Sequence, residues 1–159
     1  MIPLSSQAPD FALLSHSDRT VRLSDFRGKT NVVLAFHVLA FTPVCAVQMQ
    51  TYERARDRFD ALDAVVFGIS VDAAPAKKAW AESLGGISFE MLSDFHPHGA
   101  VASAYGVMRT DGISERAIVV VDKQGRVAWA KKYDIPEQPD LNELIGVLER
   151  LPSTTLLDP

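Results

Sequence analysis

The sequence offers little for disulfide or thiolate chemistry, because its 159 residues contain a single cysteine, Cys45. One cysteine excludes an intramolecular disulfide and a zinc site of several thiolates. Any disulfide that this chain forms must therefore join it to another molecule. A lone cysteine is most often a small buried hydrophobe, so the residues around Cys45 have to show whether it is reactive.

Long apolar runs and an excess of positive charge are also missing. No stretch approaches the ~18 apolar residues that a membrane-spanning helix needs, and the N-terminus, MIPLSSQAPDF, lacks the basic and apolar parts of a signal peptide. The formal net charge is -4, and the densest cationic cluster, Arg54, Arg56 and Arg58, is interleaved with Glu53 and Asp57. We therefore expect a cytoplasmic protein that binds neither nucleic acid nor a membrane.

The first half of the chain alternates apolar runs with amphipathic segments. Residues 31–38 (NVVLAFHV) and 64–71 (AVVFGISV) are nearly continuous apolar runs, typical of strands buried on both faces of a sheet. Apolar residues at helical spacing predict an amphipathic helix over 44–62, and alanine and lysine content favours a second helix over 72–84. The predicted order is thus β, α, β, α.

The second half predicts a hairpin and a closing helix. The expected elements are a short strand at 89–93, a short helix at 98–105, paired strands at 117–122 and 126–133, and a helix at 141–151. With 9–23 as an N-terminal extension, this order is typical of an α/β thioredoxin-like fold, a central mixed β-sheet flanked by helices. We expect one domain over 1–159, with 151–159 as a tail or a segment docked on a partner subunit.

Cys45 falls where a helix is expected to begin. Thr42 supplies a hydroxyl at the cap position, and Pro43 suits the first helical position, where its missing N–H costs nothing. A thiol in the first turn is close to the positive end of the helix dipole and to unpaired backbone N–H groups, both of which favour the thiolate. The strand-to-helix junction places the sulfur at the carboxyl edge of the sheet, where open α/β folds bind ligands.

A thiolate at this edge could reduce a peroxide if donors met both oxygens and a fixed positive charge lay nearby. The Thr42 hydroxyl and the backbone N–H groups of Val44 and Cys45 are the candidate donors, whereas Pro43 cannot donate. The residues thus supply donors, and the positive charge has to come from elsewhere in the chain.

The segment AFTPVC, residues 40–45, resembles the peroxidatic motif P-x-x-x-T-x-x-C of the peroxiredoxins. Thr42 and Cys45 match, whereas the motif proline, which shields the cysteine and narrows the pocket, would fall at Val38. APDFALLS, VRLSDFRGK, MLSDFHPHGAVASAYGV and GISERAIVVVDKQGRV resemble peroxiredoxin segments in the same order, so the resemblance covers most of the chain. It points to the bacterial one-cysteine branches, alkyl hydroperoxide reductase E and bacterioferritin-comigratory proteins.

The resemblance implies a set of catalytic roles. Cys45 would be the nucleophile, and Arg116, which matches the family's active-site arginine, would position and polarise the peroxide together with Thr42. Arginine suits this role because it stays charged and presents a planar fork of donors. Gln48 would hold that arginine in a supporting role.

The same resemblance implies the substrates and partners. Val38, Phe41, Val44 and Gln48 would form the substrate site, and Phe41 could instead take part in a dimer contact. The substrate would be hydrogen peroxide or an organic hydroperoxide. With no resolving cysteine, the sulfenic acid would be reduced by an external thiol: thioredoxin, a glutaredoxin-like protein or a small thiol. The resemblance implies no metal, haem or flavin cofactor, and a homodimer packed through the edge near the active site.

Two other functions stay open at this point. A redox sensor or partner-binding protein would use Cys45 for mixed disulfides without reducing peroxides. A thioredoxin-like disulfide oxidoreductase is disfavoured, because no C-x-x-C pair exists to resolve a mixed disulfide. Among the histidines, a core position for His37 is favoured over a role as base, and loop positions for His96 and His98 over a metal pair.

Overall fold

The structure is a computed structural model that describes residues 1–152. Its helices and strands, in chain order, are β1 (Ala12–Leu14), β2 (Thr20–Arg22), the 3-10 helix η1 (Leu23–Phe26), β3 (Asn31–Phe36), α1 (Pro43–Arg54), α2 (Arg56–Ala61), β4 (Ala64–Ser70), α3 (Ala74–Ser83), β5 (Met91–Ser93), α4 (Ala100–Ala104), β6 (Arg116–Val121), β7 (Val127–Tyr133) and α5 (Leu141–Glu149). Residues 153–159 of the predicted tail lie outside the described part. Within that part, none of the helices is long and apolar enough to cross a membrane.

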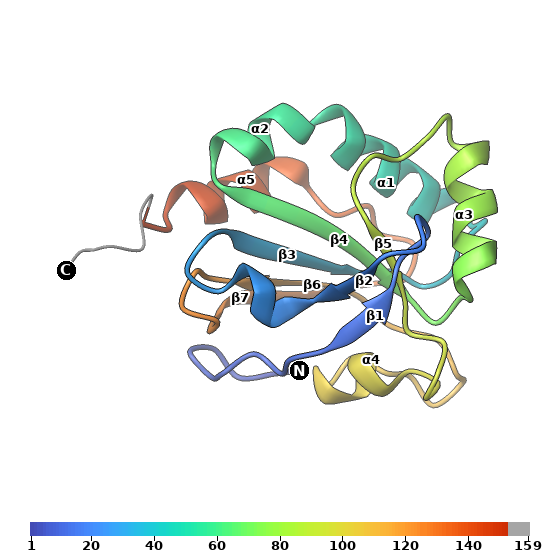
Figure 1. Cartoon of the computed structure of the whole chain (residues 1–159), viewed down its shortest axis with the longest axis horizontal. Helices are drawn as coiled ribbons and strands as arrows, with labels where there is room; N and C mark the ends of the chain where they lie inside the picture. Colours follow the sequence, from blue (N-terminus) through green and yellow to red (C-terminus); the bar gives the residue numbers. More distant parts are fainter. Residues whose placement is uncertain (153–159) are drawn as a thin grey trace.

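A five-stranded mixed sheet forms the centre of the molecule, in the strand order β5-β4-β3-β6-β7 (Figure 1). β3 runs parallel to β4 and antiparallel to β6, and β4 runs parallel to β5. Because β3 is the middle strand, both of its faces are covered and all six residues are buried. The carboxyl ends of β3, β4 and β5 therefore meet at one edge, beside the start of the antiparallel β6.

Each face of the sheet packs against its own hydrophobic cluster, because side chains alternate along a strand. Val33 and Ala35 of β3 belong to the cluster that also contains residues of α1, α2, α3 and α5. Val32 and Leu34 point to the opposite face, which is covered by the N-terminal hairpin β1–β2, η1 and α4. Figure 1 shows α1, α2 and α5 above the sheet and α4 below it.

The predicted strands are confirmed, with ends that differ by a few residues. One prediction was wrong: the single helix expected over 44–62 is divided into α1 and α2 at Ala55, which has φ -94° and ψ 8°. The Ala55 N–H is shared between the carbonyls of Thr51 and Tyr52, both at 3.1 Å, and this tighter bonding ends the first helix. The apolar pattern does not reveal the break, because the buried residues Tyr52, Ala55 and Phe59 continue before, at and after it.

Candidate active site

Cys45 is the third residue of α1, at the edge of the sheet where β3 ends. Thr42 precedes the helix in an extended conformation, with φ -113° and ψ 145°, and Pro43 opens it. The first backbone hydrogen bond runs from the Ala46 N–H to the Thr42 carbonyl at 2.9 Å. The N–H groups of Val44 and Cys45 come before this bond and have no acceptor within the helix. They could therefore donate hydrogen bonds to an oxygen of a ligand.

Arg116 brings a buried positive charge to the sulfur. It is the first residue of β6, whereas the predicted strand began one residue later, and its exposed fraction is 2%. Its Nη1 lies 3.3 Å from the Cys45 Sγ and 3.2 Å from the Gln48 Oε1, while its Nε donates to the Ile135 carbonyl at 2.9 Å. Because β6 runs antiparallel to β3, the start of β6 lies beside the end of β3, and residues 71 positions apart meet.

Gln48 and Tyr52 extend this contact along one face of α1. Gln48 is fully buried, and its Nε2 donates to the Tyr52 hydroxyl at 3.0 Å while its Oε1 accepts from Arg116. Burial raises the pKa of Tyr52 to about 12, so the phenol stays neutral at physiological pH. Hydrogen bonds therefore connect Tyr52 to Gln48 and Gln48 to Arg116. They hold the guanidinium in place while it donates to the sulfur of Cys45.

The surroundings of Cys45 favour its thiolate. Burial raises the pKa of the thiol, but hydrogen bonding by the Thr42 side chain and the Leu39 backbone, together with the Arg116 guanidinium, brings that pKa below its ordinary value of 9.0. The Thr42 hydroxyl has a single hydrogen, which it donates here to the Leu39 carbonyl at 2.7 Å. Rotation of the hydroxyl can turn the same hydrogen toward the sulfur once the thiolate forms.

A model described as the AhpC/TSA family matches residues 4–130, which is most of the chain. The chain belongs to the AhpC/TSA family. Among its relatives, the alkyl hydroperoxide reductase E of Mycobacterium tuberculosis is 39% identical over 132 residues, covering 82% of this chain and 86% of that protein. The peroxiredoxin resemblance and its one-cysteine branch are confirmed.

Solved structures agree with this membership. The structure titled as the reduced 2-Cys peroxiredoxin of Plasmodium vivax has a TM-score of 0.84 and 27% identity, covering 92% of this chain and 80% of that one. The structure titled as Mycobacterium tuberculosis AhpC has a TM-score of 0.85 at 23% identity, with 94% and 92% covered, and supports the fold alone. The predicted thioredoxin-like fold is thus confirmed.

The residues expected to form the substrate site of this AhpC/TSA protein lie at different depths, with Gln48 fully buried against Arg116. Val38 is buried in the same cluster as Cys45, and Val44 is half-buried. Phe41 is 60% exposed, with its backbone in the left-handed region at φ 64°, and its ring centroid lies 6.4 Å from that of Trp80. The Cys45 side chain itself is fully buried, so a peroxide has to move some of these neighbours to reach the sulfur.

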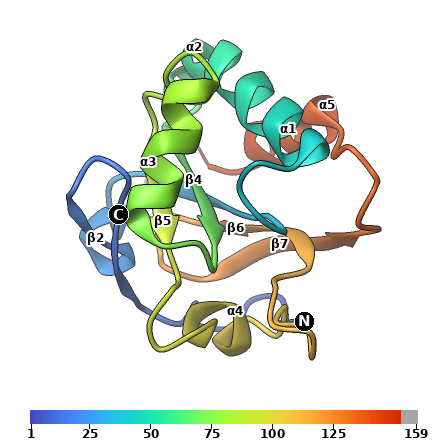
Figure 2. The ribbon, with the colours of Figure 1, turned by 90° about the vertical axis from the view of Figure 1, so that its right-hand side faces the viewer.

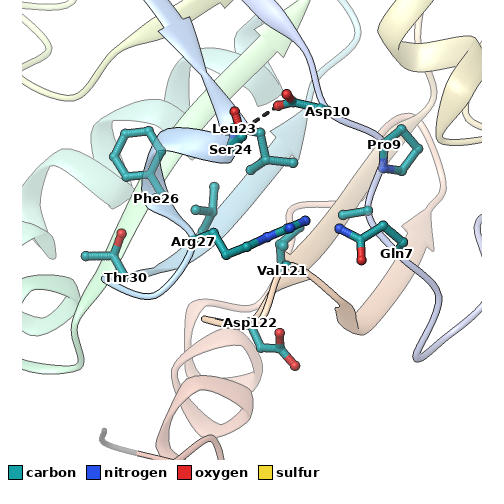
Figure 3. A pocket seen from close by; sticks show the side chains of 13 residues that line it. Gln7, Pro9, Asp10, Leu23, Ser24, Phe26, Arg27, Thr30, Val121 and Asp122 are labelled. Atoms are coloured by element: carbon teal, nitrogen blue, oxygen red, sulfur yellow. Dashed lines mark hydrogen bonds between the residues drawn. The ribbon is translucent and has the colours of Figure 1, made fainter. Parts of the chain in front are cut away.

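A cavity of about 310 Å³ lies at the opposite end of β3 from Cys45 (Figure 3). It is lined by Gln7, Ala8, Pro9, Asp10, Leu23, Ser24, Phe26, Arg27, Thr30, Val32, Val121, Asp122 and Gly125. The Arg27 side chain extends across it toward Gln7, and Asp10 accepts a hydrogen bond from the Ser24 N–H at 2.9 Å. None of the predicted site residues contributes to this cavity, so it is separate from the thiol site.

Tyr52 is the site residue that sequence reasoning missed. It lies four residues after Gln48 on the same helix, where side chains at that spacing are neighbours. A tyrosine on the buried face of a helix needs a partner for its hydroxyl, and the nearest polar side chain one turn earlier is Gln48. This spacing was the available signal.

We expect Gln48→Leu to slow the oxidation of Cys45 by about tenfold, the effect of losing one hydrogen bond to a charged group. The variant removes an acceptor of Arg116 and the donor to Tyr52, so the guanidinium is held less firmly against the sulfur. Stopped-flow oxidation by hydrogen peroxide measures the change. Gln50→Leu, on the same helix but bonded to the Leu84 carbonyl, is the matched control. An unchanged rate in a folded Gln48→Leu protein would remove Gln48 from the site.

Proposed function

We propose that this AhpC/TSA protein is a thiol-dependent peroxidase that reduces hydrogen peroxide or organic hydroperoxides through a sulfenic acid on Cys45. The observation that carries the proposal is the contact of the Arg116 Nη1 with the Cys45 Sγ at 3.3 Å inside a buried site. A buried arginine held on a thiol stabilises its thiolate and can orient an incoming peroxide by its remaining donors. Simple packing of a small hydrophobe would need no such charge.

The reaction follows from these groups. The Cys45 thiolate attacks one peroxide oxygen, a sulfur–oxygen bond forms and the oxygen–oxygen bond breaks. The second oxygen leaves with the electron pair as hydroxide or alkoxide and takes up a proton, so the peroxide becomes water or an alcohol. Arg116, the Thr42 hydroxyl and the backbone N–H groups at the start of α1 are the donors that can hold the two oxygens during attack.

The return of Cys45 to the thiol requires a second molecule, because the chain contains one cysteine. An external thiol attacks the sulfenic sulfur and releases water, which leaves a mixed disulfide. A second thiol then displaces Cys45 and carries away the disulfide. We propose thioredoxin, a glutaredoxin-like protein or a small thiol as this reductant, and the cytoplasm as the compartment, since free thiols stay reduced there.

We also propose that the protein works as a homodimer packed through the edge near the active site. Two large apolar side chains support this: Phe41, next to Thr42, is 60% exposed, and Val47 on α1 is 48% exposed. Large apolar side chains that stay exposed in one subunit are candidates for burial against a second. The proposal places the partner subunit beside the loop that leads into α1.

The proposed function is tested by mixing the reduced protein with hydrogen peroxide or cumene hydroperoxide in stopped flow. Trp80 reports on the site, because its ring lies 5.2 Å from His37 and 6.4 Å from Phe41 between centroids. We expect oxidation at least ~10³-fold faster than that of an unassisted thiol, as donors aimed at a transition state provide. Oxidation at the rate of a free thiol would contradict the proposal and favour a redox sensor that forms mixed disulfides.

A further inference from the structure

A buried lysine lies beside the catalytic edge and takes no part in the chemistry described above. Lys77 is on α3, which packs against β5 (Figure 2), and its exposed fraction is 0%. Its Nζ donates to the Leu92 carbonyl and to the Ser70 hydroxyl, both at 2.9 Å. The His37 Nε2 lies 3.1 Å from the same nitrogen and the Gly68 carbonyl 3.4 Å. One ammonium group is thus surrounded by acceptors from the ends of three strands.

The contact with His37 connects Lys77 to the beginning of the loop 37–42, which joins β3 to α1. His37 is the first residue of that loop and is fully buried. Burial lowers the pKa of His37 well below 6.5, and the charges of Lys77 and Arg116 lower it further, so the imidazole is neutral. Its Nε2 therefore accepts from the Lys77 ammonium, which leaves the proton on Nδ1, beside the Leu39 backbone.

The contact with Ser70 connects Lys77 to the second half of the same loop. The Ser70 hydroxyl, which accepts from Lys77, donates to the Asp72 Oδ2 at 2.6 Å. That carboxylate oxygen also accepts the Ala40 N–H at 2.8 Å. A continuous chain of hydrogen bonds therefore runs from α3 to Ala40, two residues before Thr42. The loop is thus held at His37 and at Ala40 by hydrogen bonds that lead to the Lys77 ammonium.

Burial of this ammonium costs stability. Desolvation lowers the pKa of Lys77 from 10.5 to about 7, although the negative charges of Asp72, Cys45 and Asp94 oppose the shift. Between about pH 7 and 10.5 the unfolded chain binds a proton that the folded chain does not, so stability rises with pH across this window and is lower at pH 7 and below. An apolar side chain would avoid this penalty. The penalty, together with the contacts to the loop, argues for a role in the reaction.

We propose that Lys77 is a positioning residue for peroxide reduction: its buried ammonium holds the loop 37–42 at His37 and, through Ser70 and Asp72, at Ala40, and adds a second positive charge that acts on the Cys45 thiolate. The inference rests on the proposed peroxidase function. In this arrangement Arg116 holds the sulfur directly, while Lys77 holds the backbone that carries Thr42 into position. Lys77 does not contact the sulfur, so its loss weakens the site without removing the nucleophile.

If the charge of Lys77 supports the reaction, the rate of oxidation depends on the protonation of Lys77 as well as on that of Cys45. The titratable and charged groups that act on it from the surrounding elements are His37 after β3, Asp72 after β4, Asp94 after β5 and Cys45 on α1, and Arg116 on β6 acts on His37. The reactive state combines the Cys45 thiolate with the Lys77 ammonium. Because the two groups titrate as a coupled pair, the rate of oxidation should be highest where the thiolate–ammonium state is most populated and should fall as Lys77 loses its proton near pH 7.

The test compares Lys77→Met with Lys78→Met, the exposed neighbouring lysine that serves as the matched control. Stopped-flow rates with hydrogen peroxide are measured from pH 5 to 9.5, and the thiolate absorbance of the lone cysteine gives the pKa of Cys45 without peroxide. For Lys77→Met we expect a rate about tenfold lower at pH 6.5, a raised Cys45 pKa and no fall in rate at high pH. Lys78→Met should match the wild type. A Lys77→Met protein with the wild-type profile would overturn the inference.

Asp72→Asn keeps the test decisive if Lys77→Met fails to fold. An asparagine oxygen can still accept from Ser70 and Ala40, but the negative charge that raises the pKa of Lys77 is gone. The falling limb of the rate should then move to lower pH by about one unit, and an unmoved limb would count against Lys77. If the wild type reacted with peroxide no faster than a free thiol, the proposed function would fail. The thiolate titrations would then still show whether Lys77 sets the pKa of Cys45.

Discussion

Replacement of Cys45 by serine is expected to lower peroxide reduction by at least ~10⁴-fold, to the level of the uncatalysed reaction. A serine hydroxyl does not ionise near neutral pH, so the neighbouring Arg116 has no anion to stabilise, and an oxygen nucleophile cannot form a sulfenic acid. Because the chain has no other cysteine, no second thiol can take over the reaction. The measurement is the consumption of hydrogen peroxide with a small dithiol as reductant.

Two controls separate this chemical loss from a loss of structure. Ser83→Ala, at an exposed serine whose hydroxyl bonds the Trp80 carbonyl, should keep the wild-type rate. Wild-type protein alkylated at Cys45 should be as inactive as Cys45→Ser. Thermal unfolding should show that Cys45→Ser remains folded, since serine is close to cysteine in size. Peroxide consumption by Cys45→Ser at more than a hundredth of the wild-type rate would mean that another group carries the reaction.

The part of the site that is local in sequence could be predicted from the residues alone. Thr42, Pro43 and Cys45 lie within four positions of one another, so helix-start chemistry and the end of an apolar strand were enough to place the thiol at the sheet edge. Arg116 is different. It meets Cys45 across 71 residues through the antiparallel pairing of β3 with β6, and no local pattern contains that register, so only the family resemblance pointed to it.

The buried polar network behind the site was hidden for a physical reason. Alanine and lysine both favour helices, so their content predicted α3 without showing which lysine faces the core. In the fold, Ala74, Lys77 and Ala81 share the buried side of α3 at spacings of three and four. That spacing places Lys77 among the buried residues of the helix. Its acceptors, however, come from strand ends whose neighbours are set only by tertiary structure.

Replacement of Arg116 by lysine is expected to slow Cys45 oxidation by about 10²-fold, in the range found for donors that act on a transition state. The guanidinium bonds the sulfur, Gln48 and the Ile135 carbonyl at the same time. A lysine keeps the charge, but its point-like ammonium on a flexible stem cannot reproduce the planar fork. Arg109→Lys is the matched control, because Arg109 lies at the surface in ion pairs with Asp111 and Glu115.

Arg116→Met then separates the charge from the geometry. Since the guanidinium lowers the pKa of Cys45, its removal should raise that pKa, so the methionine variant needs a higher pH than the wild type to form its thiolate. The lysine variant should keep more of the lowered pKa and still react slowly at pH values where its thiolate is fully formed. Equal rates for wild type and Arg116→Lys at full ionisation would show that the charge alone suffices. A persistent deficit means that Arg116 also orients the peroxide, which a positive charge without the fork does not provide.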